Sequence, residues 1–361
     1  MPFRHNAAPM RSTVLAFLAL TFAACGDDSS GDADAAPPMR TVVLEAMVGS
    51  TGLSPELTFT LPESSRSVTV IVEGAPSALY ALGALTFADG VDRVALPAGA
   101  PGPAMQHMYH VEQIGQMAGN LYQSIRLGTF THVYPYRPDQ VLVAGTASLR
   151  VASDTPGPAR VTLLMPEENG ARVLPLNVFV VSDTLSMPAT EQFTTELSRI
   201  LGQAGITVTI ANMERVSGTS LSQITTSTEP QEAPDSQAAM LPALVGDRML
   251  TGLDVFYVES LPAGIAGLSL GTPGPPLRGS YYFGVLWRQG LGSIQAARVL
   301  AHEVSHFLAL QHLENTGVSG QTYPDPLDDT TPGVDNLMED GTLLTADQSF
   351  ALTRSALLVT P

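Results

Sequence analysis

Residues 302–312 read HEVSHFLALQH, and this stretch holds three of the seven histidines in the chain. Side chains four residues apart lie on one face of an α-helix, so His302 and His306 can bind the same ion. Glu303 follows the first histidine and can lean toward a water molecule on that ion. Neutral imidazoles suit zinc, and three protein ligands with one open position form a catalytic zinc site. The stretch therefore predicts a zinc-activated water with Glu303 as its general base.

The third histidine requires a break in the helix. His312 lies six residues after His306, which is about 600° of rotation at roughly 100° per residue. On a continuous helix it would face away from the other two, so the chain must leave the helix near Ala309 and turn back. The alternative is a two-histidine zinc site in which His312 is not a ligand.

Further motifs follow toward the C-terminus. Residues 325–329 read DPLDD and are followed by TTP, residues 335–338 read DNLM, and residues 344–348 read LTADQ. Together with HEVSHFLALQH they resemble the metzincin zinc metalloproteases, most closely the pappalysin and cytophagalysin type. The resemblance covers residues 173–358 and is strongest from 294 to 350.

The resemblance implies a zinc endopeptidase acting on peptides or proteins. Zinc would be held by His302, His306 and His312, and Met338 would be the structural methionine of the Met-turn beneath them. Two positions depart from the family: Ala309 stands where the pattern has glycine, and Asp340 stands where many members carry a tyrosine. The alternative function is a catalytically inactive metzincin-like module that binds partners at the cell surface.

An acidic loop precedes the methionine. Asp325, Asp328 and Asp329 resemble the loop that binds calcium in some members of the family. Three carboxylates alone do not define a calcium cage. The sequence leaves two alternatives, a Ca²⁺ site and a solvated acidic loop.

The N-terminus has the features of an export signal. Arg4 and Arg11 precede a short apolar run, Val14–Ala24, with small residues at its end. Cys25 stands where a bacterial lipoprotein signal has its lipidated cysteine. We therefore expect a signal peptide over residues 1–24, a lipidated flexible tether over 25–39, and a periplasmic or surface lipoprotein of the outer membrane. The alternative is an ordinary signal peptide with a chance cysteine.

The amino-acid composition limits which kinds of molecule the protein can bind. The chain has 361 residues and a formal net charge of −17, and all 17 basic residues are arginine. Such an acidic chain lacks the basic stripe of a nucleic-acid-binding protein. Cys25 is the single cysteine, so no internal disulfide can form. The oligomeric state is not determined by the sequence.

Hydrophobic patterns divide the chain into two regions. The pattern of residues 40–165 predicts short strands separated by turns, and one of these strands is expected at residues 141–144. Together the strands predict an all-β, sandwich-like accessory domain. Residues 166–172 would be a linker. Residues 173–361 predict an α/β (α+β) metzincin-like domain with a mixed sheet, an active-site helix capped by Ser293, and a last helix capped by Thr345 and Gln348.

Overall fold

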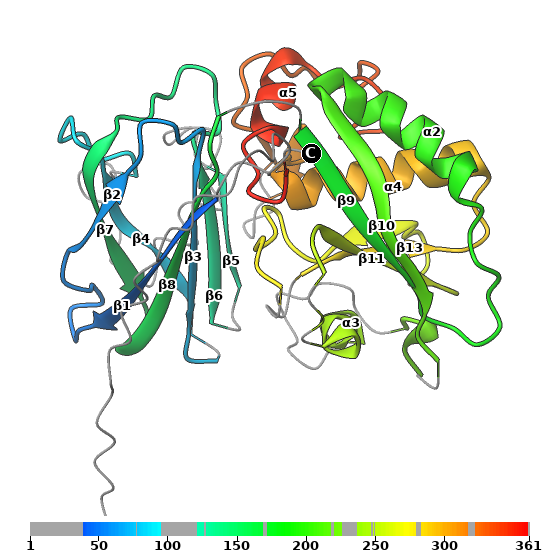
Figure 1. The fold of residues 1–361 in the computed structure, drawn as a ribbon, viewed down its shortest axis with the longest axis horizontal. Coiled ribbons are helices and arrows are strands. Elements are labelled where there is room, and N and C mark those ends of the chain that lie inside the picture. Colours follow the sequence, from blue (N-terminus) through cyan, green and yellow to red (C-terminus); the bar gives the residue numbers. More distant parts are fainter. Residues whose placement is uncertain are drawn as a thin grey trace, which may run out of the picture. The chain divides into compact units, whose positions relative to one another are not determined.

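A computed structural model describes residues 39–76, 78–94, 121–125, 128–168, 172–217, 220–225, 237–246, 248, 250–278, 283–316 and 322–359 (Figure 1). The fold is mixed α and β, with several sheets and few helices, as the sequence predicts. Residues 1–38, which include the predicted signal and Cys25, lie outside the described part.

The first half of the chain forms two antiparallel sheets. One has the strand order β1 (Arg40–Val48), β8 (Gly157–Met165), β3 (Val68–Gly74), β6 (Thr129–Tyr134) and β5 (Leu121–Ile125). The other has the order β2 (Leu57–Leu61), β7 (Gly145–Ser153) and β4 (Tyr80–Thr86). Inward side chains of both sheets, among them Val70, Leu163 and Leu149, belong to one buried hydrophobic cluster.

The prediction of a strand at residues 141–144 is wrong. These residues form no ladder, and the strand β7 begins only at Gly145. Val141 is 62% exposed, while Leu142 and Val143 pack partly against the cluster below. Their β-propensity is overridden because no neighbouring strand pairs with them.

The second half is built on a mixed sheet. Its order is β10 (Ile206–Arg215), β9 (Arg172–Val180), β11 (Leu253–Val258), β13 (Val285–Arg288) and β12 (Gly267–Ser269). Four strands are parallel, and the edge strand β12 runs antiparallel to β13. The sheet therefore presents β12 at one edge.

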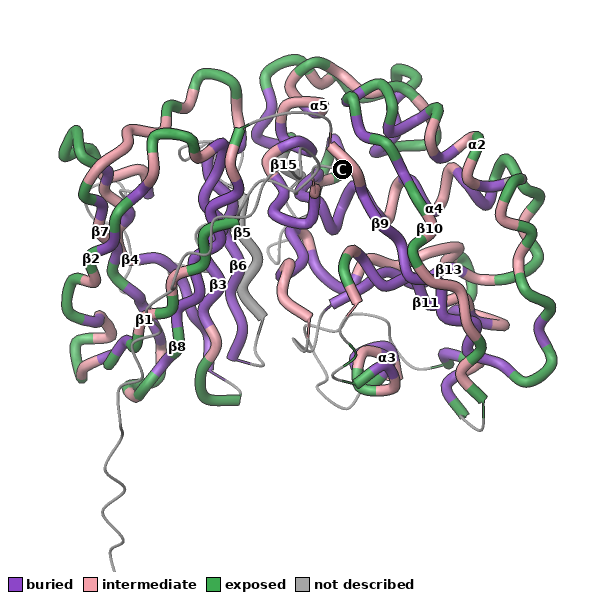
Figure 2. Tube along the Cα trace, viewed as in Figure 1, coloured by how far each residue is buried: buried purple, intermediate pink, exposed green. Residues whose placement is uncertain are grey.

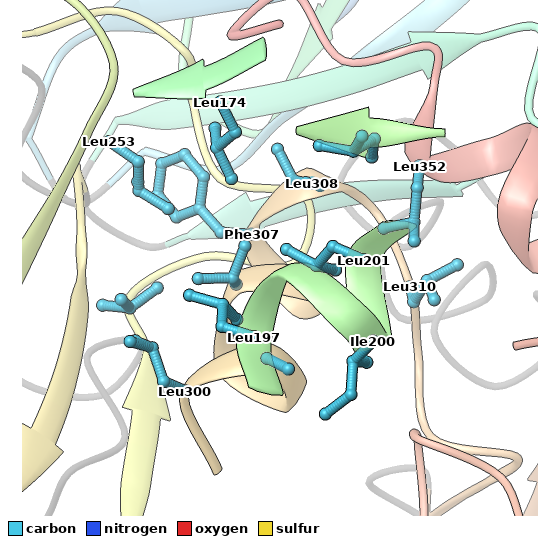
Figure 3. Packing of buried hydrophobic residues seen from close by; sticks show 14 of the residues in the cluster. Leu174, Leu197, Ile200, Leu201, Leu253, Leu300, Phe307, Leu308, Leu310 and Leu352 are labelled. Atoms are coloured by element: carbon cyan, nitrogen blue, oxygen red, sulfur yellow. The ribbon is translucent and has the colours of Figure 1, made fainter. Parts of the chain in front are cut away.

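Helices cover both faces of this sheet. The helices α2 (Thr190–Leu201) and α4 (Ser293–Leu308) share one cluster with Leu174, Leu176 and Leu253 (Figure 3). The helix α3 (Gln237–Val245) packs with Phe179 and Phe256, whose side chains belong to the opposite face. Side chains alternate between faces along a strand, so strands covered on both faces are mostly apolar, and β9 and β11 are buried along most of their length (Figure 2).

Short elements complete the fold. They are the 3-10 turns η1 (Gly202–Ala204) and η2 (Ser220–Ser222), the hairpin β14 (Glu314–Thr316) and β15 (Thr322–Pro324), and the last helix α5 (Ala346–Leu352). The capping box of α5, Thr345 with Gln348, is confirmed. Among the described residues, no helix has both the length and the apolar character needed to cross a membrane.

Candidate metal centre

The helix α4 carries the first two histidines. Its buried positions, among them Ala297, Leu300 and Val304, recur at helical spacing and face the core. The predicted cap is displaced by one residue, because Gly292 is the N-cap and Ser293 is the first helical residue. His302 and His306 therefore lie one turn apart on the same stretch of helix.

The helix ends where the sequence predicted it must. Ala309 has φ 133° and ψ 11°, and it is the only described non-glycine residue with positive φ. Its N–H donates to the carbonyl of His306 (3.1 Å), and the N–H of Leu310 donates to the carbonyl of Ser305 (2.8 Å). These two bonds form a Schellman motif, in which glycine is the usual residue at the left-handed position. Alanine accepts the same conformation at a cost on the order of 1–3 kcal/mol.

The turn brings His312 back to the other two histidines. Its Nε2 lies 3.1 Å from Nε2 of His302 and 3.1 Å from Nε2 of His306. Nδ1 of His302 donates to the carbonyl of Leu337, and Nδ1 of His306 donates to the carbonyl of Leu310, each at 2.7 Å. Since a carbonyl only accepts, both Nδ1 atoms carry the proton and both neutral rings direct an Nε2 lone pair at the same point.

Electrostatics keeps the three rings neutral. Burial lowers the pKa of His302 to about 4, with a further lowering from His312. Burial lowers the pKa of His306 well below its usual value, and the two neighbouring rings add to the effect. The pKa of His312 is also lowered by burial. Neutral imidazoles are the form that binds a metal.

A metal ion fits this donor set. Bonds of about 2.0–2.1 Å in a tetrahedral arrangement place zinc-bound nitrogens roughly 3.3 Å apart, close to the 3.1 Å found for two of the pairs. Among the described residues, this triad is the group of three ligand-type side chains whose atoms converge within 4.8 Å. The carbonyls of Leu337 and Leu310 fix the ring orientations, as outer partners of metal-bound histidines do.

Glu303 lies beside the triad and against the edge strand. Burial raises the pKa of its carboxyl to about 8, and a hydrogen bond from the backbone N–H of Ser269 partly offsets the rise. A cation at the triad would lower that pKa, because nearby positive charge favours the carboxylate. A Cβ on Gly267 would lie 2.6 Å from Cγ of Glu303. The edge strand can approach Glu303 this closely only because residue 267 is glycine.

The segment that contains Met338 is held by buried amides. The side chains of Asn336 and Gln348 exchange two hydrogen bonds of 3.0 and 3.1 Å, and Oδ1 of Asn336 also accepts the N–H of Met338. Leu337, whose carbonyl accepts the hydrogen bond from His302, lies between Asn336 and Met338 in the chain. Met338 is fully buried in the same hydrophobic cluster as α4. These partners were missed from the sequence, where only the capping role of Gln348 gave a signal.

The structure does not assemble the three aspartates into a cation cage. Asp325 is buried and accepts hydrogen bonds from Thr330 and from the N–H of Leu327. Asp328 is exposed and pairs with Arg137 at 3.5 Å, and Asp329 accepts the N–H of residue 347. Although Oδ2 of Asp325 is buried without a hydrogen-bond partner, the three carboxylates do not converge within 4.8 Å as the histidines do, so the calcium alternative gains no support.

A cleft of about 600 Å³ opens beside His302 and Glu303. Its walls come from α4, from residues 264–267 before and within β12, and from residues 337–341. Asp340, at the position where the family resemblance predicts a tyrosine, is exposed in this cleft, and its charge raises the pKa of His302 against the larger lowering by burial. One member of the triad, His302, therefore lines the cleft together with Glu303.

Comparisons with known proteins give distant structural neighbours. No family model and no curated protein matches the sequence. Archaemetzincin from Methanopyrus kandleri aligns with a TM-score of 0.27 and 12% identity over 51% of this chain and 87% of its own. Metalloproteinase-II from Bacteroides fragilis aligns with a TM-score of 0.29 and 14% identity over 63% of this chain and 62% of its own. Similarity at this level decides neither fold nor function, so the assignment of a metal site rests on the geometry of the three histidines.

Proposed function

We propose that this protein is a zinc-dependent endopeptidase. The observation that carries the proposal is the convergence of Nε2 of His302, His306 and His312, together with the open cleft that His302 and Glu303 line. A purely structural zinc site is closed by a fourth protein ligand, whereas a catalytic site leaves one position open. Here three ligand side chains converge, and one of them, His302, lines the cleft with Glu303.

The chemistry requires a proton acceptor next to the ion. When bound, zinc acidifies a water molecule and polarises the scissile carbonyl. Glu303 takes the proton of the attacking water and passes it to the leaving amine nitrogen, so that one carboxyl serves as base and then as acid. The hydrogen bond from Ser269 and the contact with Gly267 orient that carboxyl. The carbonyls of Leu337 and Leu310 keep two imidazoles aimed at the metal.

The substrate would bind as an extended strand. The strand β12 is at the edge of the mixed sheet and runs along the cleft beside α4. An exposed edge can pair with the backbone of a peptide, and such pairing depends little on sequence. This favours cleavage within a chain rather than at a fixed terminus.

We also propose the finer relationship, a metzincin of the pappalysin or cytophagalysin type. The helix with its turn at Ala309 and the buried segment around Met338 support it. In this proposal Met338 forms the floor of the site without binding the metal. The accessory domain at 40–165 would be a β-sandwich joined to the catalytic domain by residues 166–172.

The decisive experiment compares the parent protein with Glu303→Gln. We expect one zinc per chain in both and cleavage of casein or a peptide library by the parent alone. Zinc in both with cleavage in neither would instead favour the inactive surface module. Full activity of Glu303→Gln would refute the role of the carboxyl.

We propose, from sequence alone, that the chain is exported and anchored to the outer membrane through lipid on Cys25. The support is the signal pattern of residues 1–24 and the polar tether that follows. Mass spectrometry of the mature protein tests it: a diacylated or triacylated Cys25 at the N-terminus is expected, and an unmodified terminus would refute it.

A further inference from the structure

Arg298 lies in the cleft one helical turn before His302. Because residues four apart share a helix face, Arg298 and His302 both point to the side of α4 that lines the cleft. Arg298 also lines an adjoining hollow of about 650 Å³ with residues 333–335 and 339–342. The guanidinium therefore stands where the two hollows meet.

Within the described part of the chain this guanidinium forms no ion pair within 4.0 Å, although its charge acts at longer range on Glu196 of α2, a carboxylate already paired with Arg199. No hydrogen bond or ion pair reaches it, and its buried Nε lacks an acceptor. By contrast, Arg278 pairs with Asp254, and Arg199 pairs with Glu196. The chain carries 34 acidic and 17 basic residues, so a carboxylate partner is easily available.

The acidic side chains of the cleft do not neutralise it. The carboxylate of Glu339 accepts the N–H of Gly333, and Asp335 accepts the N–H of Thr342. Asp340 is exposed and lies farther than 4.0 Å from the guanidinium nitrogens, since no ion pair forms. The wall formed by α4 is therefore positive, while the wall at 339–340 is negative.

We propose that Arg298 is a specificity residue that binds a carboxylate of the peptide substrate. A guanidinium offers a planar fork that matches a carboxylate with two parallel hydrogen bonds. One helical turn is about 5.4 Å, and an extended peptide advances about 3.3–3.6 Å per residue. The carboxylate consequently lies within about two residues of the cleaved bond. This inference rests on the proposed function, because it assigns the substrate of the same cleft.

Two sources supply the same chemistry, an acidic side chain within the peptide and the carboxylate of its C-terminus. The probes are labelled peptides in four forms. All positions within two residues of the cleavage point carry either glutamate or glutamine, and the C-terminus is either an acid or an amide. Dependence on glutamate identifies the side chain as the ligand. Dependence on the terminal acid identifies the chain end.

The test measures binding, so that it does not need turnover. Zinc-loaded Glu303→Gln is titrated with each peptide by fluorescence anisotropy, alone and combined with Arg298→Gln, Arg298→Glu or the control Arg160→Gln. Arg160 is exposed on β8, in a different sheet, and its replacement removes the same charge. We expect at least tenfold tighter binding of a carboxylate peptide, loss of that preference in Arg298→Gln, inversion in Arg298→Glu, and no change in Arg160→Gln. Zinc content and circular dichroism verify the fold of each variant.

A second variant keeps Arg298 intact. Asp340→Asn removes the negative charge from the opposite wall, so binding of the carboxylate peptides should tighten further. Equal binding of acid and neutral peptides, or a preference that survives Arg298→Gln, overturns the inference. The proposed function fails separately, if the parent cleaves no peptide although the carboxylate preference is present. Cleavage by the parent without the preference leaves the proposed function and removes the inference.

Discussion

The substitution Gly267→Ala tests how Glu303 is positioned. A Cβ at residue 267 would lie 2.6 Å from Cγ and 2.9 Å from Oε1 of Glu303, and 2.7 Å from Cγ1 of Val299. Ordinary contact begins at 3.4 Å, so Glu303 must withdraw by about 0.8 Å. The φ of Gly267 lies outside the positive region from +20° to +160°, so the substitution adds volume without backbone strain.

The expected loss is one of rate. A displacement of about 1 Å in a catalytic group can cost on the order of 100-fold, which corresponds to about 2.7 kcal/mol in the barrier. Most of the clash falls on a side chain that can rotate, so zinc content and melting temperature should change little. The assay is kcat/KM on a fluorogenic peptide, with zinc measured by atomic absorption on the same samples.

Gly202→Ala is the matched control. Gly202 has φ −61° in a helical turn, and nothing lies within 4 Å of its Cβ position. The same substitution there should leave kcat/KM unchanged. If Gly267→Ala retains activity within threefold of the parent, the close approach of β12 does not position Glu303 and the argument fails.

Three further predictions concern the metal, a buried ion pair and pH. His312→Ala should weaken zinc binding by more than the 10–100-fold typical of losing an outer hydrogen-bond partner, in competition with a chelator; little change would support the two-histidine site. Arg278→Met should lower the unfolding free energy by about 3–5 kcal/mol, because it leaves the buried carboxylate of Asp254 without the two hydrogen bonds of 2.5 and 2.6 Å that Arg278 donates. Denaturant titrations measure the loss, and adding Asp254→Asn to the same chain should recover most of it. Burial raises the pKa of Asp325 to about 6, above its unfolded value, so this group favours the fold at low pH and its contribution declines between about pH 4 and pH 6. Asp325→Asn should therefore make the unfolding free energy depend less on pH between about pH 4 and pH 6. An unchanged pH dependence would contradict the raised pKa of Asp325.

Local patterns predicted the parts of the site that are local. The spacing of His302 and His306 and the rotation to His312 required a break near Ala309, and the structure places a left-handed residue there. Helical periodicity and the capping box likewise located the start of α4 and the start of α5 to within a residue. These features follow from chain geometry within one or two turns, which a single sequence contains.

Contacts between distant segments could not be predicted. The carbonyl of Leu337 that orients His302 is 35 residues away, and backbone acceptors leave no trace in side-chain identity. The meaning of Gly267 depends on Glu303 approaching it from another element. For the acidic loop, where the sequence leaves a Ca²⁺ site and a solvated loop open, the partners Thr330 and Arg137 of Asp325 and Asp328 could likewise not be predicted.

The compactness of the triad in sequence affects how strongly a metal can stabilise the folded chain. All three donors lie within residues 302–312, so an unfolded chain keeps them within reach of one another. A ligand stabilises the native state only by the excess of its affinity over that for the denatured ensemble. Residual chelation by that ensemble would make the rise in melting temperature smaller than the native affinity alone implies. The excess comes from the distant carbonyl of Leu337 and from the Schellman turn, so thermal shifts upon adding zinc report on that scaffold more than on the imidazoles themselves.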